Sequence, residues 1–86
     1  MKVGFDKIFL KEVKRLPVPQ QKLLAQKINL LVSNPFDTRL HTKSLSTPLQ
    51  GIYSFRVTRE YRVLFRFVSA EEIMLLTVKH RKDVYR

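Results

Sequence analysis

The sequence has 86 residues, a formal net charge of +10 and no cysteine. A chain of this length can bury one small core, so we expect residues 1–86 to form a single domain. The lack of cysteine excludes a disulfide-stapled fold and a thiolate metal site. No signal-peptide pattern opens the chain and no apolar run could span a bilayer, so we expect a cytoplasmic protein.

The excess of basic residues is the strongest feature of the composition. Seventeen Lys and Arg stand against seven Asp and Glu. In a small domain such an excess is typical of proteins that bind a polyanion, namely nucleic acid, an anionic membrane or an acidic protein. We do not expect membrane binding, because the basic residues are spread along the chain and do not form one face of an amphipathic helix. The alternative is a basic surface that only keeps the protein soluble.

The N-terminal part of the chain predicts a short edge strand and two helices. The strand covers 2–5, and Asp6 is a suitable N-cap for a first helix that runs to about Leu16. Pro19 fits the first turn of a second helix, from Pro19 to Ser33, and Asn34-Pro35 ends it. The short link between them predicts an antiparallel pair. Its buried faces are expected to hold Phe5, Phe9, Val13, Leu16, Leu23, Leu24, Ile28 and Leu31.

The segment 36–50 has no clean period. We expect its three leucines, Leu40, Leu45 and Leu49, to tuck a loop under a sheet. Pro48 and Gly51 mark the start of a hairpin.

The hairpin is the clearest pattern in the sequence. Residues 53–57 and 61–67 alternate between apolar and polar, as half-buried strands do. A three-residue turn at 58–60 pairs Val57 with Tyr61 and closes the apolar face on itself. On the other face it sets Arg56 opposite Arg62, a like-charge pair that destabilises a sheet by roughly 0.2–1 kcal/mol. The pair indicates either a site for an anion or two solvated arginines.

The last strand, 73–79, is apolar at both parities, so its register on the hairpin stays open. An even register brings His80 to the face of Arg56, Arg62 and Arg66, whereas an odd register brings Lys79. We expect the fold class to be α+β: a small single domain with a two-helix hairpin on one face of an antiparallel sheet, in the order β-α-α-β-β-β.

His80 is a candidate general base, because His80 and His41 are the two groups whose intrinsic pKa lies near neutrality. Two distant histidines and scattered carboxylates do not make a metal site, and we expect no cofactor. The tail, residues 79–86, combines cations with Tyr85, a mixture suited to phosphates and to stacking on an unpaired base. The alternative for the tail is a frayed terminus.

Four stretches in this order resemble the RelE/ParE toxin superfamily, and most of all its RelE/StbE-type branch. They are Leu49-Gln-Gly51, Tyr53-Ser-Phe-Arg-Val57, Tyr61-Arg-Val-Leu-Phe65 and Val78-Lys-His-Arg-Lys-Asp-Val-Tyr85. The resemblance implies a toxin of a type II toxin–antitoxin system that cuts mRNA in the ribosomal A site. It also implies a cognate antitoxin, which we expect to be acidic where it binds.

The family chemistry is attack of a ribose 2′-OH on the adjacent phosphate, without a metal ion. The resemblance implies catalytic roles for five residues: Arg56, Arg62, His80, Arg81 and Tyr85. No carboxylate or lysine base is evident beside Arg56, which leaves the base as His80 or Tyr85. We expect RNA phosphates to be held by Lys43, Arg59, Arg66, Lys79, Lys82 and Arg86. The alternative function is that of a ParE-like toxin, which binds DNA gyrase and cleaves nothing.

Overall fold

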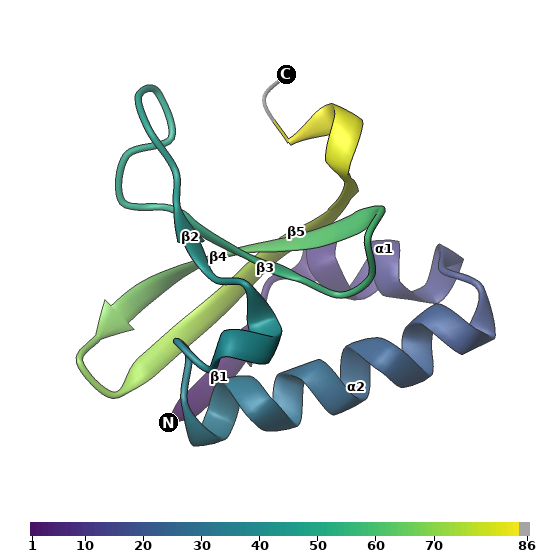
Figure 1. Ribbon diagram of the computed structural model, residues 1–86, viewed down its shortest axis with the longest axis horizontal. Helices are drawn as coiled ribbons and strands as arrows, with labels where there is room; N and C mark the ends of the chain where they lie inside the picture. The colour runs from purple at the N-terminus through teal and green to yellow at the C-terminus, as the bar shows by residue number, and fades with distance from the viewer. Residues whose placement is uncertain (85–86) are drawn as a thin grey trace.

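The computed structural model describes residues 1–84. Within them, two helices and a five-stranded sheet form an α+β fold, as expected (Figure 1). The elements are β1 Lys2–Phe5, α1 Lys7–Arg15, α2 Val18–Ser33, β2 Lys43–Ser44, β3 Tyr53–Arg56, β4 Tyr61–Ser69 and β5 Glu72–His80. Two 3-10 turns, η1 Thr38–Leu40 and η2 Arg81–Asp83, complete the order. Strand β2 lies in the segment that was expected to be irregular, so the predicted order lacked one strand.

The helices begin and end close to the predicted residues. Asp6 caps α1, because its Oδ1 accepts a hydrogen bond from Ile8 N–H at 2.9 Å. In α2, Leu24 and Leu31 are buried, but Leu23 is 38% exposed, so its predicted burial is wrong. It lies about 100° around the helix from Leu24, off the face that Leu24 and Leu31 share. No helix within residues 1–84 is long and apolar enough to cross a bilayer.

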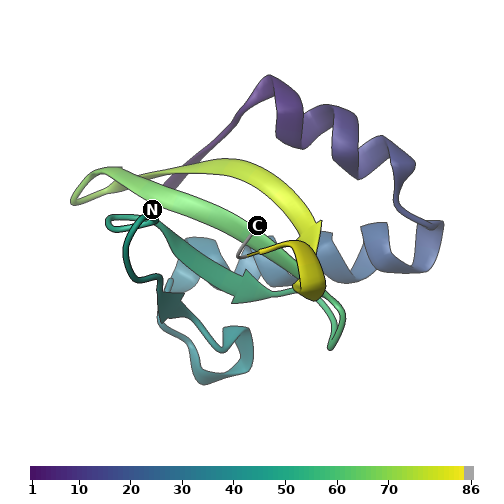
Figure 2. The same cartoon turned by 90° about the horizontal axis from the view of Figure 1, so that it is seen from above.

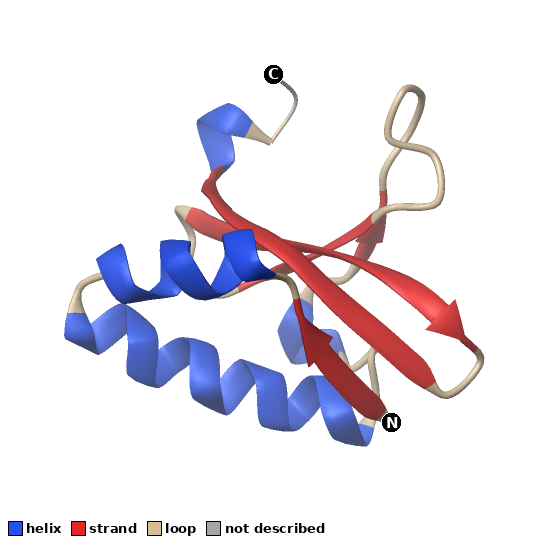
Figure 3. Ribbon diagram, turned by 180° about the vertical axis from the view of Figure 1, so that it is seen from behind, coloured by secondary structure: helices blue, strands red, loops and turns tan. Residues whose placement is uncertain are grey.

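The sheet has the strand order β1-β5-β4-β3-β2, in which β1 runs parallel to β5 and the other pairs are antiparallel. Figure 2 shows α2 beneath the strands and α1 beside β5, and Figure 3 shows the two helices running back along each other. A carboxylate ties α1 to β5. Glu12 Oε1 accepts from Thr77 Oγ1 at 2.5 Å and from Val78 N–H at 3.1 Å.

The hairpin has the predicted register. Val57 N–H donates to the Tyr61 carbonyl at 3.0 Å, and Arg56 lies opposite Arg62. The apolar face of the hairpin enters the main core with residues from β5 and the helices. Its fully buried side chains include Phe9, Leu31, Leu40, Phe55, Val63, Phe65, Ile73 and Leu75.

A β-bulge in β5 decides the register that the sequence left open. Phe65 pairs with Leu75, and Leu64 pairs with Thr77, so Leu76 has no opposite residue on β4. The register is therefore even where Phe65–Phe67 pair with Ile73–Leu75 and odd beyond Leu76; a second shift lies beside the turn, where Ser69 pairs with Glu72. A strand whose facing changes in the middle needs apolar residues at both parities, which is the pattern of 73–78.

A second, smaller core lies on the other face of the sheet. Buried Leu45, Leu64 and Val84 meet there, and Leu49 and Ile52 pack against them. The loop 45–52 and the C-terminal turn rise from the sheet on the side away from α2 (Figure 1). This cluster covers part of the sheet face that carries Arg56 and Arg62. Leu40 packs in the main core, whereas Leu45 and Leu49 belong to the smaller core. The three leucines of segment 36–50 therefore do not pack together.

Candidate nucleic-acid interface

Three cations lie in one row across three neighbouring strands. Arg56 on β3 is opposite Arg62 on β4, and Arg62 is opposite Lys79 on β5. All three residues are half-buried. Directly opposed side chains of one sheet face have their Cβ atoms roughly 4.5–5.5 Å apart, so the positive charges are held close together at the expense of stability. The Nε of Arg56 is buried and has no hydrogen-bond partner within residues 1–84.

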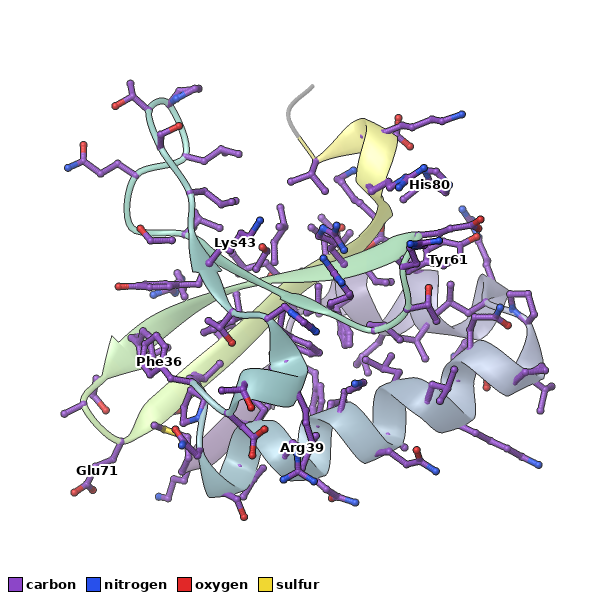
Figure 4. All side chains as sticks on the ribbon, in the orientation of Figure 1. Phe36, Arg39, Lys43, Tyr61, Glu71 and His80 are labelled. Atoms are coloured by element: carbon purple, nitrogen blue, oxygen red, sulfur yellow. The ribbon has the colours of Figure 1, made fainter. Side chains whose placement is uncertain are left out.

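A cleft of about 400 Å³ adjoins this row. Among residues 1–84 its walls include four cations and no carboxylate: it is lined by Lys43, Ser54, Arg62, Arg81, Lys82 and Val84. Strand pairing explains one wall, because Lys43 on β2 lies opposite Ser54 on β3. Lys43 extends from β2 toward the side of the sheet on which the C-terminal turn stands (Figure 4).

The C-terminal turn forms the other wall. Arg81 N–H donates to the Glu60 carbonyl at 2.6 Å, which fixes η2 to the β3–β4 turn. Val84 is 4% exposed and anchors the far end of η2 on the small core. These two attachments hold Arg81 and Lys82 beside Arg62, although the three residues come from two distant parts of the sequence.

His80 lies apart from the cation row. It pairs with Tyr61 on β4, and the two rings meet edge to face at 5.6 Å and 79° (Figure 4). Its Nδ1 accepts a hydrogen bond from Lys82 N–H at 3.2 Å. A neutral imidazole in that arrangement carries its proton on Nε2, so Nε2 is a donor and not a base. The odd register therefore places Lys79, and not His80, with the arginines.

The other predicted residues are dispersed. Arg66 is exposed on β4 and pairs with Met74, and Arg59 is exposed in the β3–β4 turn; neither lines the cleft. Tyr85 and Arg86 lie outside the described residues. Ser54, which is 3% exposed and lines the cleft, was not predicted. Its position two residues before Arg56, on the same strand face, was the available signal.

Two further cavities within residues 1–84 contain none of the predicted site residues. One of about 500 Å³ lies at the opposite end of β5 and is lined by Met1, Lys2, Ser69, Ala70, Glu71 and Glu72. An apolar one of about 150 Å³ lies between α1 and α2, lined by Phe5, Phe9, Leu10, Val13, Gln21, Leu24, Ala25 and Ile28. Within residues 1–84, no group of three or more His, Cys, Asp or Glu is placed to hold a metal ion.

Solved structures of similar fold are toxins and toxin–antitoxin complexes. The toxin–antitoxin complex RelBE2 from Mycobacterium tuberculosis contains a chain that is 26% identical, with a TM-score of 0.78 over 93% of this chain and 96% of that one. For the RelE–RelB complex from Pyrococcus horikoshii the identity is 20% and the TM-score 0.78, over 96% and 97% of the chains. The YoeB/ParE toxin from Agrobacterium tumefaciens is 16% identical, with a TM-score of 0.80 over 94% of this chain and 99% of that one.

No curated protein has a significantly similar sequence. A family model described as the ParE toxin of type II toxin-antitoxin system, parDE, matches residues 3–85. This match spans nearly all of the 86 residues. The chain therefore belongs to the ParE toxin family of type II toxin–antitoxin systems.

Proposed function

We propose that this toxin inhibits translation by cutting mRNA in the ribosomal A site. The observation that carries the proposal is the cation row Arg56–Arg62–Lys79, which a cleft joins to Arg81 and Lys82. Three directly opposed cations suit a phosphodiester that gains negative charge during the reaction.

The proposed step is attack of a ribose 2′-oxygen on the adjacent phosphorus. The bond between phosphorus and the 5′-oxygen breaks, leaving a 2′,3′-cyclic phosphate and a 5′-OH. Arg62 holds the non-bridging oxygens through its planar guanidinium. Arg56 stabilises the added charge, and a phosphate oxygen gives its buried Nε–H the acceptor that it lacks. An ammonium is a proton donor, so Lys79 is placed to protonate the leaving 5′-oxygen.

The residue that accepts the proton of the 2′-OH stays a prediction. Of the two residues that the sequence suggested, Tyr85 lies outside the described residues, and His80 is turned toward Tyr61.

The proposed partner in regulation is an antitoxin encoded beside the toxin. The Mycobacterium tuberculosis and Pyrococcus horikoshii neighbours were solved in complex with antitoxins. The net charge of +10 favours an antitoxin that is acidic where it covers this chain, because opposite charge speeds association and improves specificity.

The experiment is a reconstituted translation reaction in which the ends of the mRNA are mapped after the toxin is added. The proposal expects new 5′-OH ends at A-site codons with the parent and none with Arg62→Ala. Arg66→Ala is the matched control, because Arg66 lies on the same strand and face but outside the cleft. Intact mRNA with the parent would contradict the proposal. Inhibition of DNA gyrase by the same preparation would then establish the alternative function.

A further inference from the structure

Phe36 is the exposed end of a chain of aromatic contacts that begins in the core. Phe55 contacts Phe65 with ring centroids 6.0 Å apart, and Phe65 contacts Tyr53 at 5.6 Å and Phe67 at 5.7 Å. Tyr53 and Phe67 each contact Phe36 at 6.1 Å. Phe55 and Phe65 are fully buried, but Phe36 is 57% exposed. The outermost ring is therefore braced by rings that are packed into the core.

The ring of Phe36 presents a flat face. It lies at 20° to the ring of Phe67 with the centroids 6.1 Å apart, so the two rings are nearly parallel and offset, and more than half of the Phe36 surface is exposed. The peptide group that precedes the ring is fixed by two hydrogen bonds: Phe36 N–H donates to Asn34 Oδ1 at 3.0 Å, and Thr42 Oγ1 donates to the Pro35 carbonyl at 2.6 Å. A ring held in this way loses little conformational freedom when a ligand binds.

A flat ligand fits this surface better than an inserted side chain does. Phe36 lines none of the three cavities described above. Residues that dominate protein–protein affinity sit in well-packed pockets, whereas a nucleobase stacks on an exposed aromatic face. The net charge of +10 favours a polyanion that carries such bases.

The Phe36 surface and the cation cleft lie on opposite faces of the sheet, near the edge formed by β2. Ser54 lines the cleft, and its neighbour Tyr53 contacts Phe36 on the opposite face of the sheet. Lys43 lies opposite Ser54 on β2, which is only two residues long and forms the edge of the sheet. In the view of Figure 4, Lys43 lies between Phe36 and the end of the molecule that holds His80. A single strand bound in the cleft would have to round this edge to reach Phe36.

We infer that Phe36 is a stacking platform for an unpaired base of RNA, outside the cleft that holds the reacting phosphate. The identity of that strand as mRNA rests on the proposed function, but the stacking chemistry does not. The platform stacks with one base and discriminates little between the four bases, because each base has a π-face.

Tryptophan fluorescence tests the inference directly. The chain contains no tryptophan, so Phe36→Trp introduces a single reporter on the platform. The titrant is a 2′-O-methyl single-stranded RNA, which lacks the attacking hydroxyl and cannot be cleaved. We expect this RNA to quench the emission of the Phe36→Trp variant and a duplex of equal length not to do so. Phe5→Trp is the matched control, because Phe5 is also a half-exposed ring (46%) that stacks on another phenylalanine, Phe9; the emission of this variant should not change.

Affinity separates stacking from packing. Phe36→Ala should weaken single-stranded RNA binding about 5- to 100-fold, the range for loss of one stacked base. Phe36→Tyr should bind as the parent does. Phe36→Leu keeps an apolar cover over Phe67 and Tyr53, so it should melt near the parent but bind RNA as weakly as the alanine variant.

Three results would overturn the inference: parental RNA affinity in Phe36→Leu, no quenching in Phe36→Trp, or equal quenching in Phe5→Trp. If the emission of Phe36→Trp responds to the antitoxin and not to RNA, this surface is a protein-docking site instead. The assay uses neither ribosomes nor cleavage. Quenching without mRNA cleavage would therefore refute only the proposed function, and cleavage without quenching would refute only the platform.

Discussion

Glu12 joins the first helix to the last strand, and truncating its side chain should measurably lower the free energy of unfolding. Its carboxylate accepts from Thr77 Oγ1 and Val78 N–H, groups that are 65 and 66 residues away in sequence. Glu12→Ala leaves both donors without this acceptor. Val78 is 6% exposed, so its N–H has little access to water.

The expected loss follows from these two bonds. A buried backbone donor without a partner costs about 1–3 kcal/mol, and the loss of a hydroxyl bond about 0.5–1.5 kcal/mol. We therefore expect Glu12→Ala to lower the free energy of unfolding by about 2–4 kcal/mol, a large part of the roughly 5–15 kcal/mol of a small domain. In a domain of this size that corresponds to a fall in Tm of roughly 10–30 °C. Thr77→Val removes only the hydroxyl and should cost about 1 kcal/mol.

The assay is urea unfolding of Glu12→Ala, Thr77→Val and the double variant. The Thr77 hydroxyl bond is already absent in Glu12→Ala, so the double variant should be more stable than additivity predicts, by about 0.5–1.5 kcal/mol. Lys11→Ala, an exposed change on the same helix, is the control and should stay within about 0.5 kcal/mol of the parent. Additive effects, or a Glu12→Ala loss as small as the control's, would refute the reasoning.

Three further predictions concern the cation row, His80 and the loop that carries Phe36. Arg62→Lys keeps the charge but loses bidentate contact, so single-turnover cleavage should fall between the parent and Arg62→Ala, for which we expect roughly 10²–10³-fold loss; equal rates for lysine and arginine would exclude a bidentate role. Because His80 faces Tyr61, His80→Gln should leave the pH profile of cleavage unchanged, whereas a loss of roughly 10²–10⁴-fold would make it the base. Hydrogen bonds from Arg39 lower the pKa of Asp37 from 3.8 to about 2, so this contact stabilises the fold fully above pH 3.8 and its contribution is lost as the pH falls toward 2. Thermal melts from pH 5 to 2 should show a shallower fall for Asp37→Asn than for the parent, and identical slopes would contradict the assignment.

The parts of the fold that the sequence predicted have a local cause. The hairpin follows from strict alternation around 58–60, and α1 follows from Asp6 and the spacing of its apolar residues. The contacts that build the cleft have no local pattern. Val84 packs against Leu45 and Leu64, which are far from it in sequence. Strand β2 is only two residues long, and it is a strand because it pairs with β3. The row of Arg56 and Arg62 was therefore predictable, but the wall formed by η2 was not.

The unmatched residue Leu76 also has a consequence for how chain length varies in this strand. Phe65–Leu75 and Leu64–Thr77 are consecutive pairs on β4, and only Leu76 intervenes on β5. Deleting Leu76 would leave a regular ladder from Phe67 to Tyr61, in which Lys79 still lies opposite Arg62. An insertion or deletion inside a strand ordinarily exchanges its two faces. Here Leu76 is already unpaired, so its loss would not exchange the faces of the residues that follow it. The distance along the chain from Ile73 to Lys79 can therefore differ by one between proteins that present the same cation, and an alignment that compares them should place its gap at Leu76.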